Sequence, residues 1–181
     1  MSNGHRLARP HWIVLVAAVL GGCASPATLE GMTVVPTDIR SATASAELRD
    51  AISIRSVAGG EPTNPLWTSE VGNAEFRAAL ESSLRNYGVL AEDGPGDYAL
   101  DATLVDLQQP LFGLAMEVTS TATYHLEPQS PPKTSFDDTV ITSYTVSPSE
   151  SFFAVQRLRL ANEGAIRENI REFIRRLEAA Y

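Results

Sequence analysis

The stretch MEVTSTATYHL at residues 116–126 alternates between apolar and polar side chains. Met116, Val118, Ala122, Tyr124 and Leu126 fall on one parity, whereas glutamate, threonine and histidine fall on the other. Because successive side chains of a β-strand point to opposite faces, this period of two predicts a strand with one buried face. One solvent-exposed face is typical of an antiparallel sheet, since the strands of a buried parallel sheet are apolar on both faces.

A similar alternation occurs in three other segments, at residues 48–54, 98–104 and 136–146. Turn sequences rich in glycine and proline follow or precede them, at residues 59–62, 92–97 and 128–133. We therefore expect four strands, the last three in direct succession along the chain.

A first helix is expected over residues 73–87, between the first two strands. Its apolar face has spacings of four, four and three and consists of Phe76, Leu80, Leu84 and Tyr87. Asn73 or Ser69 is available as the N-cap, and Gly88 suits the left-handed position after the last turn.

A second helix is expected from Ser147 to about Ala180. Ser147 and Glu150 form a capping-box sequence, with Pro148 at the first helical position. Two charge pairs spaced by four residues, Glu163–Arg167 and Glu172–Arg176, would add a few tenths of a kcal/mol each. The expected buried stripe consists of Val155, Leu158, Ile166, Ile170, Phe173 and Leu177.

The element order is therefore β-α-β-β-β-α, which predicts an α+β fold. We expect a two-layer sandwich in which two helices pack on one mainly antiparallel four-stranded sheet. This single domain would span residues 47–181. Residues 23–46 are rich in small residues, threonine and proline, and we interpret them as a flexible tether, with a short strand at 32–35 as the alternative.

The N-terminus has the organisation of a secretory signal. Arg6 and Arg9 precede a short apolar run over residues 12–20, and no acidic residue occurs before it. The sequence Leu20-Gly21-Gly22-Cys23 then resembles a bacterial lipobox, which implies cleavage before Cys23 and acylation of that cysteine. An ordinary secretory signal with a chance cysteine and an uncleaved anchor are the alternatives.

The lipobox resemblance also implies a location. Ala24, rather than aspartate, follows the cysteine, and in the lipoprotein system of enteric bacteria this implies sorting to the periplasmic face of the outer membrane, with the inner membrane as the alternative. Residues 1–22 would be the signal peptide. The remaining 159 residues carry 12 basic and 22 acidic side chains, and this excess of negative charge disfavours nucleic acid as a partner.

Composition also argues against several kinds of chemistry. Cys23 is the single cysteine, so no internal disulfide can form, and His125 is the single histidine after the expected signal. No clustered ligand sequence for a metal, no phosphate-binding loop and no Gly-x-Ser-x-Gly motif occurs. We therefore predict no catalytic residue, no cofactor and no metal; a Ser-His-Asp triad using His125 is the weak alternative.

Two places are candidate contact sites. Arg159, Asn162 and Glu163 lie close to the apolar stripe of the last helix, either as a structural ion pair with Asn162 satisfying a backbone group, or as a polar notch for a ligand head group or partner. Trp67, in the loop over residues 61–69, either folds back over the sheet edge or docks a partner.

A family resemblance completes the interpretation. A lipobox, a tether and the order β-α-β-β-β-α resemble the auxiliary lipoproteins of lipopolysaccharide and ABC-type lipid transport, and residues 59–69 and 157–167 look like those of uncharacterised proteobacterial envelope lipoproteins. The resemblance implies a non-enzymatic, lipid-anchored adaptor of an envelope transport or assembly complex. A lipid- or glycan-binding module with a groove between helices and sheet is the alternative, and an envelope hydrolase or transferase is a third.

Overall fold

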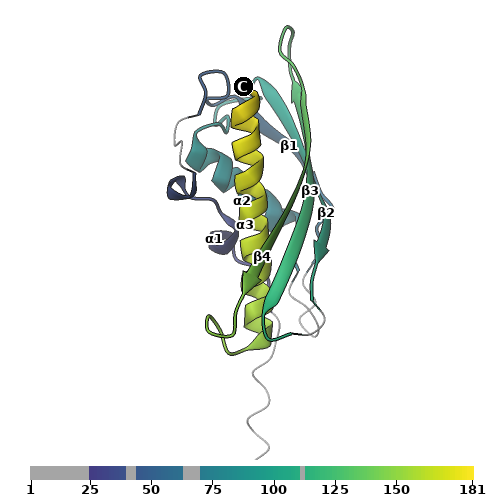
Figure 1. Cartoon of the computed structure of the whole chain (residues 1–181). Coiled ribbons are helices and arrows are strands. Elements are labelled where there is room, and N and C mark those ends of the chain that lie inside the picture. Colours follow the sequence, from purple (N-terminus) through teal and green to yellow (C-terminus); the bar gives the residue numbers. More distant parts are fainter. Residues whose placement is uncertain (1–24, 40–43, 63–69, 111–112) are drawn as a thin grey trace, which may run out of the picture.

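A computed structural model describes residues 25–39, 44–62, 70–110 and 113–181 of the chain. Three α-helices, a short 3-10 helix and four strands follow one another along it (Figure 1). In chain order they are α1 (Leu29–Met32), η1 (Pro36–Asp38), β1 (Ile52–Ala58), α2 (Asn73–Tyr87), β2 (Tyr98–Gln108), β3 (Met116–Pro128), β4 (Phe136–Val146) and α3 (Ala154–Ala180).

The four strands form one mixed sheet in the order β1-β2-β3-β4. β1 runs parallel to β2, because α2 carries the chain back between them, and the other two pairs are antiparallel. The long helix α3 lies along one face of the sheet (Figure 1). The expected α+β fold, with helices on a mainly antiparallel four-stranded sheet, is confirmed.

The alternation in β3 determines which face is covered. All five apolar residues of one parity are buried, as is Ser120 on the same parity, and the polar residues of the other parity are exposed or partly exposed. The buried face meets α3, where Tyr124 stacks on Phe173 with ring centroids 3.9 Å apart and an interplanar angle of 9°. The period of two therefore places the core between the sheet and α3, as predicted.

Helix α2 has the bounds that its spacing predicts, and its four apolar stripe residues are buried. Gly88 follows it in the left-handed region at φ 79°, where its amide closes the last turn on Arg85 and Leu84. The N-cap is Gly72 rather than Asn73. Asn73 instead accepts a hydrogen bond at Oδ1 from the Gly60 amide at 2.7 Å, which ties the end of β1 to the start of α2.

Helix α3 begins at Ala154, seven residues after the Ser147 start that its capping-box sequence predicts. Half of the capping box forms, since Glu150 accepts a hydrogen bond from the Ser147 amide at 2.7 Å, but the Glu150 amide donates to the Ser147 carbonyl rather than to its hydroxyl, and the pair closes a separate turn. Arg157 is the physical reason for the break. Its Nη1 donates to the carbonyl oxygens of Ser151 and Phe152 at 2.8 and 2.9 Å, and these are the acceptors that a continuous helix would use internally.

The predicted stripe of α3 is correct in its C-terminal part and wrong at its start. Ile166, Ile170, Phe173 and Leu177 are buried, whereas Val155 is 36% exposed and Leu158 is only partly buried. Val155, in the first turn of α3, lies outside the core, whereas Leu158 packs against a second apolar cluster that contains Met116, Val118 and Val146.

The two charge pairs expected on α3 have different outcomes. Glu172 pairs with Arg176 at 2.7 Å, as predicted. Glu163 pairs instead with Arg159, at 3.8 Å. Arg167 donates to the Gly31 carbonyl at 2.7 Å, because the N-terminal segment lies against this part of the helix.

The N-terminal segment differs from the tether that its composition predicts. Within the described residues 25–39, Ala27, Met32, Val34 and Ile39 are buried in the core. Val34 is held on both sides: its amide donates to Ser83 Oγ at 2.9 Å, and its carbonyl accepts from Asn86 Nδ2 at 3.0 Å. Small residues and threonine here permit close packing on α2 and α3, so this segment belongs to the domain, and residues 32–35 form no strand.

The ion-pair cluster on α3 predicts a pH dependence of stability. Hydrogen bonds from Arg175 and then Arg176 lower the pKa of Glu172 to about 2. Since an unfolded glutamate titrates near ~4.3, this contribution is present above that pH and is lost as the pH falls towards 2. We expect Glu172→Gln to lower the free energy of unfolding near neutral pH by up to about 1 kcal/mol. Urea unfolding of both proteins should give a difference that vanishes at low pH; a difference that persisted there would contradict the assignment.

Candidate functional site

The polar residues predicted on α3 meet the N-terminal segment of the chain. Glu163 is 4% exposed and accepts two hydrogen bonds from Thr28, at 2.8 Å from its amide and 3.0 Å from its hydroxyl. Arg159 lies on the solvent side of the carboxylate with its Nε 3.8 Å away. A buried carboxylate is stable only with such partners, and here both are supplied within the chain.

Gly31 allows this contact. A Cβ atom at this position would lie 2.3 Å from Glu163 Oε2, so only glycine lets α1 approach the carboxylate this closely. The Gly31 carbonyl accepts a hydrogen bond from Arg167 at 2.7 Å, and its amide donates to Thr28 Oγ1 at 3.2 Å. We refer to Thr28, Gly31, Glu163 and Arg167 as the N-terminal clamp.

Arg159, Asn162 and Glu163 were predicted to form either a structural ion pair or a polar notch for a ligand or partner. Arg159 and Glu163 lie together as an ion pair, and Asn162 is fully buried. The space beside Glu163 is filled by Thr28 and Gly31 rather than open to a ligand. The arrangement matches the structural ion pair more closely than the notch. Trp67, Cys23 and residues 20–22 lie outside the described residues.

Thr28 and Gly31 are absent from the sequence-based candidates. A local signal exists, because Thr28 acts as N-cap of α1 and Gly31 lies in that single turn. The contact partner Glu163 is 135 residues away in the chain, and no spacing rule reaches that far.

His125 lies on the outer face of the sheet, as its polar parity predicts. Its Nδ1 is 2.5 Å from Asp137 Oδ1 across the β3–β4 pair, and both side chains are exposed. Within the described part of the chain, Asp137 is the one side chain bonded to this ring, and no serine hydroxyl approaches it. Thr123 and Thr139 line the same hollow as this pair, but neither hydroxyl is hydrogen-bonded to the ring, and the lack of enzymatic activity stays a prediction.

The same outer face carries a charge network around Arg55. This side chain bonds to Asp101 and Glu127 on β2 and β3, and Ser56 donates to Asp101 at 2.6 Å. The hydrogen bond from Arg55 lowers the pKa of Asp101, which keeps the carboxylate charged and paired. The network holds β1 to β2 and β3 on the exposed face, and its two carboxylates outnumber the single guanidinium.

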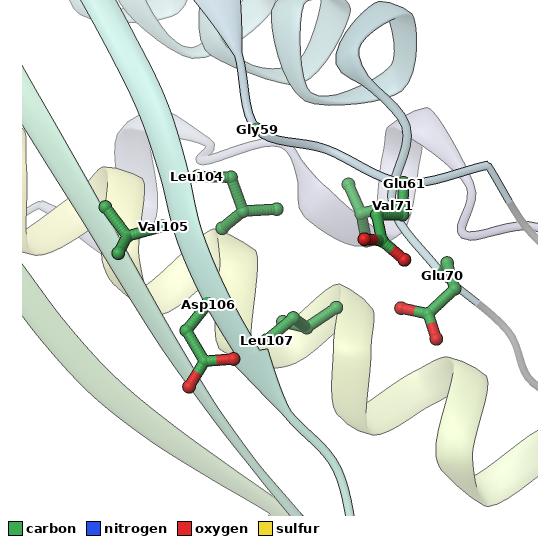
Figure 2. Close-up of a pocket in the computed structure, with 8 residues that line it drawn as sticks. All are labelled: Gly59, Glu61, Glu70, Val71, Leu104, Val105, Asp106 and Leu107. Carbon is green, nitrogen blue, oxygen red and sulfur yellow. The ribbon is translucent and has the colours of Figure 1, made fainter.

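A small cavity lies beside β2, with a volume of about 210 Å³ (Figure 2). Leu104, Val105, Asp106 and Leu107 of β2 line one side, and Gly59, Glu61, Glu70 and Val71 line the other. Glu70 already accepts a hydrogen bond from Gln109 at 3.1 Å. The volume is below that of sites for drug-sized ligands, which begin near ~300 Å³.

The described ranges contain neither a cluster of metal ligands nor a helix that could span a membrane. There, no cluster of three or more histidine, cysteine, aspartate or glutamate side chains is placed to hold a metal ion. In that part of the chain, the helices also lack the length and apolar character needed to span a bilayer.

Comparisons with known proteins give structural likenesses at low sequence identity. No family model matches the chain, and no curated protein does so. A Xanthomonas campestris protein of the domain family DUF330 is 14% identical, with 83% of this chain and 91% of that chain covered and a TM-score of 0.48. A hypothetical protein of Chlamydia trachomatis is 10% identical, with coverages of 72% and 96% and a TM-score of 0.47. A minor lipoprotein of Acinetobacter baumannii is 14% identical, with coverages of 70% and 94% and a TM-score of 0.40. With TM-scores below 0.5, no function is transferred from these proteins.

The clamp predicts a local effect of a single substitution. Glu163→Ala removes both acceptor bonds to Thr28, and hydrogen bonds to a charged group contribute about 1.5–3 kcal/mol. We expect the Thr28 and Gly31 amides to exchange with solvent roughly 10- to 100-fold faster, while β3 keeps its protection. Hydrogen–deuterium exchange measures this directly. Glu168→Ala is the matched control, because Glu168 pairs with Arg171 on the same helix; equal acceleration in both variants would rule out the clamp.

Proposed function

We propose that this protein is a lipid-anchored, non-enzymatic lipoprotein of the outer membrane that faces the periplasm and serves as an adaptor of an envelope transport or assembly complex. The observation that carries the proposal is the sequence Leu20-Gly21-Gly22-Cys23 directly behind a short apolar run with basic residues before it. Acyl chains on Cys23 would fix the protein to a leaflet, since each buried methylene contributes about 0.8 kcal/mol.

The non-enzymatic part of the proposal is supported by how the polar side chains are used. Glu163 holds Thr28, Asn169 joins α3 to the sheet, and Arg55 joins three strands. Each of these groups is engaged in bonds that maintain the fold. A rigid α+β body whose polar clusters are structural suits a protein that holds or positions a partner.

The anchor is tested by intact mass analysis of the protein extracted from bacterial membranes. The expected mass is that of residues 23–181 plus a diacylglyceryl group, with or without an additional acyl chain. Treatment with an inhibitor of the lipoprotein signal peptidase should leave the full-length precursor instead. An intact leader without inhibitor, or a free thiol at Cys23, would overturn the proposal.

The adaptor role is tested by affinity capture of the lipidated protein from solubilised envelopes under conditions that preserve membrane complexes. We expect the same set of envelope proteins to be recovered with the lipoprotein each time, in a constant ratio to it. The recovery of these proteins should fall when the complex that they form is removed from the membranes beforehand. Recovery of the lipoprotein alone would contradict the adaptor role while leaving the anchor intact.

The alternative of a lipid- or glycan-binding module has weaker support. Apolar side chains of both helices and the sheet fill the space between them in one core cluster. An open hollow of about 460 Å³ lies at the edge where α2 meets β1, and it is lined in part by Glu81, Arg85 and Glu92. Such a charged lining does not suit an acyl chain. Native mass spectrometry that found a retained lipid or glycan would favour this alternative.

A further inference from the structure

One end of the molecule exposes a group of large apolar side chains. Leu114, Phe152 and Phe153 are 79%, 90% and 74% exposed, and Val155 follows in the first turn of α3. We refer to these four residues as the apolar end. They lie together because Met116 pairs with Val146, so the segments before β3 and after β4 meet where α3 begins. In Figure 1 this end is opposite the marked C-terminus.

The exposed phenylalanines are held in place by bonds within their segment. Arg157 is buried and binds the carbonyls of Ser151 and Phe152, and Ser151 Oγ donates to Gln156 Oε1 at 3.0 Å. The segment therefore presents Phe152 and Phe153 to the outside in a fixed arrangement. Large exposed apolar groups gathered in this way mark a contact surface more often than isolated ones do.

The position of the proposed anchor on Cys23 indicates that the apolar end is the end of the molecule nearer to the membrane. Thr28 is fixed on Glu163 by the clamp, and Cys23 lies five residues before it. Five residues span at most about 18 Å when fully extended. Along α3, Phe153 is ten residues from Glu163, or about 15 Å, whereas Ala180 is seventeen residues away, or about 26 Å. The acylated residue can therefore reach the level of the apolar end, and it cannot reach the level of the opposite end.

The charges around the apolar end are compatible with a bilayer. Between residues 147 and 155, Glu150 is the single charged residue, and its carboxylate is bonded to the Ser147 amide and hydroxyl. The guanidinium of Arg157 points inward to the backbone. Contact with lipid would place the phenylalanine rings among the acyl chains, while the exposed Glu150 carboxylate, which is bonded to Ser147 and to no cation among the described residues, would stay at the level of the headgroups.

We propose that the apolar end inserts into the phospholipid leaflet that carries the acyl chains of Cys23, so that the domain stands on the membrane with α3 pointing away from it. This inference rests on the proposed lipid anchor. It adds an orientation: the C-terminus and the β3–β4 turn are directed to the aqueous side, where a partner would be met.

The test uses the lipidated protein in vesicles of phosphatidylethanolamine and phosphatidylglycerol. Phe152→Cys is labelled with a nitrobenzoxadiazole dye, and Ser130→Cys, in the exposed β3–β4 turn, is the matched control at the other end. Because acylation occupies the Cys23 thiol, the introduced cysteine alone reacts. We expect a blue-shifted emission at position 152 that is largely lost when spin-labelled lipids are added, and an unshifted, unquenched emission at position 130.

The possible failures are distinguishable. If mass analysis finds the acyl chains but the dye at position 152 stays in water, the insertion is wrong and the anchor stands. If the dye is shielded yet insensitive to the lipid quencher, a protein partner or a second copy covers this end, and the insertion is again wrong. If the acyl chains are absent, both proposals fall together.

Discussion

The Cys23→Ser variant is expected to accumulate as an unacylated precursor that keeps residues 1–22, with the acylated form of residues 23–181 almost absent. Serine offers no thiol for the diacylglyceryl transfer, so cleavage by the lipoprotein signal peptidase does not follow. The variant loses two or three acyl chains, in which each buried methylene contributes about 0.8 kcal/mol to membrane binding, so any chain from which the signal segment is removed should leave the membrane fraction. Fractionation into soluble, peripheral and integral material, followed by quantitative blotting, measures the change.

The apolar end is too small to retain the protein without the acyl chains. Full burial of a phenylalanine contributes roughly 1.5–3 kcal/mol, so Phe152 and Phe153 together contribute at most about 6 kcal/mol before the costs of association. Even a weak dissociation constant of 1 mM requires a net binding free energy of about 4 kcal/mol, which is what must remain after the costs of association are subtracted. The two phenylalanines would therefore orient an anchored domain, but they would not hold a free one on the bilayer.

The control for this experiment is Ser149→Ala, an exposed change in the turn before α3 that keeps the cysteine. It should stay with the integral fraction. Retention of Cys23→Ser through an uncleaved signal segment would show itself as a precursor of higher mass. Retention of a correctly cleaved, unmodified chain would contradict the lipid anchor.

Local patterns in the sequence were sufficient for the main layers of the fold. The parity of β3 determined which side chains are buried, because strand geometry leaves only two choices. The spacing of Phe76, Leu80 and Leu84 predicted the bounds of α2, and Gly88 predicted its C-terminal cap, although the residue at the N-cap differs from the prediction. Where several local signals pointed to the same element, the prediction matched the structure.

The start of α3 shows why a local signal can mislead. Ser147 and Glu150 make one of the two bonds of a capping box, and yet the helix begins at Ala154. The deciding group is Arg157, which lies inside the helix and reaches back to the carbonyls of Ser151 and Phe152. A side chain that competes for backbone acceptors from within the following element is not visible in a motif of four residues.

In the candidate site, too, one contact could be predicted from the sequence and another could not. The contact between Arg159 and Glu163 follows from their spacing of four on a helix. The contact between Glu163 and Thr28 depends on how α1 packs against α3, and composition pointed instead to a tether. The sequence indicated only that Glu163 needs a hydrogen-bond donor, because a glutamate beside an apolar stripe is buried. That the donor is Thr28 follows from the tertiary structure.

Asn169→Ala is expected to destabilise the fold strongly, by about 3–5 kcal/mol, because it leaves several buried polar groups without partners at once. The Asn169 side chain accepts a hydrogen bond from the Tyr124 hydroxyl at 2.8 Å and donates to the Val140 and Ser120 carbonyls at 2.9 and 3.2 Å. Burial raises the pKa of Tyr124, so its hydroxyl stays protonated and needs an acceptor. For a chain of this size, such a loss lowers the midpoint of thermal unfolding by roughly 10 °C.

The hydrogen bond between Tyr124 and Asn169 can be tested separately with Tyr124→Phe and with the double variant that combines Tyr124→Phe and Asn169→Ala. Alone, Tyr124→Phe removes one bond and should cost about 1–2 kcal/mol. In the Asn169→Ala background the hydroxyl has already lost its acceptor, so removing it should cost nothing or restore stability. Urea unfolding of the four proteins gives the coupling between the two positions. Additive effects would show that the hydrogen bond between Tyr124 and Asn169 contributes little to stability and that Tyr124 acts mainly through its stacking on Phe173.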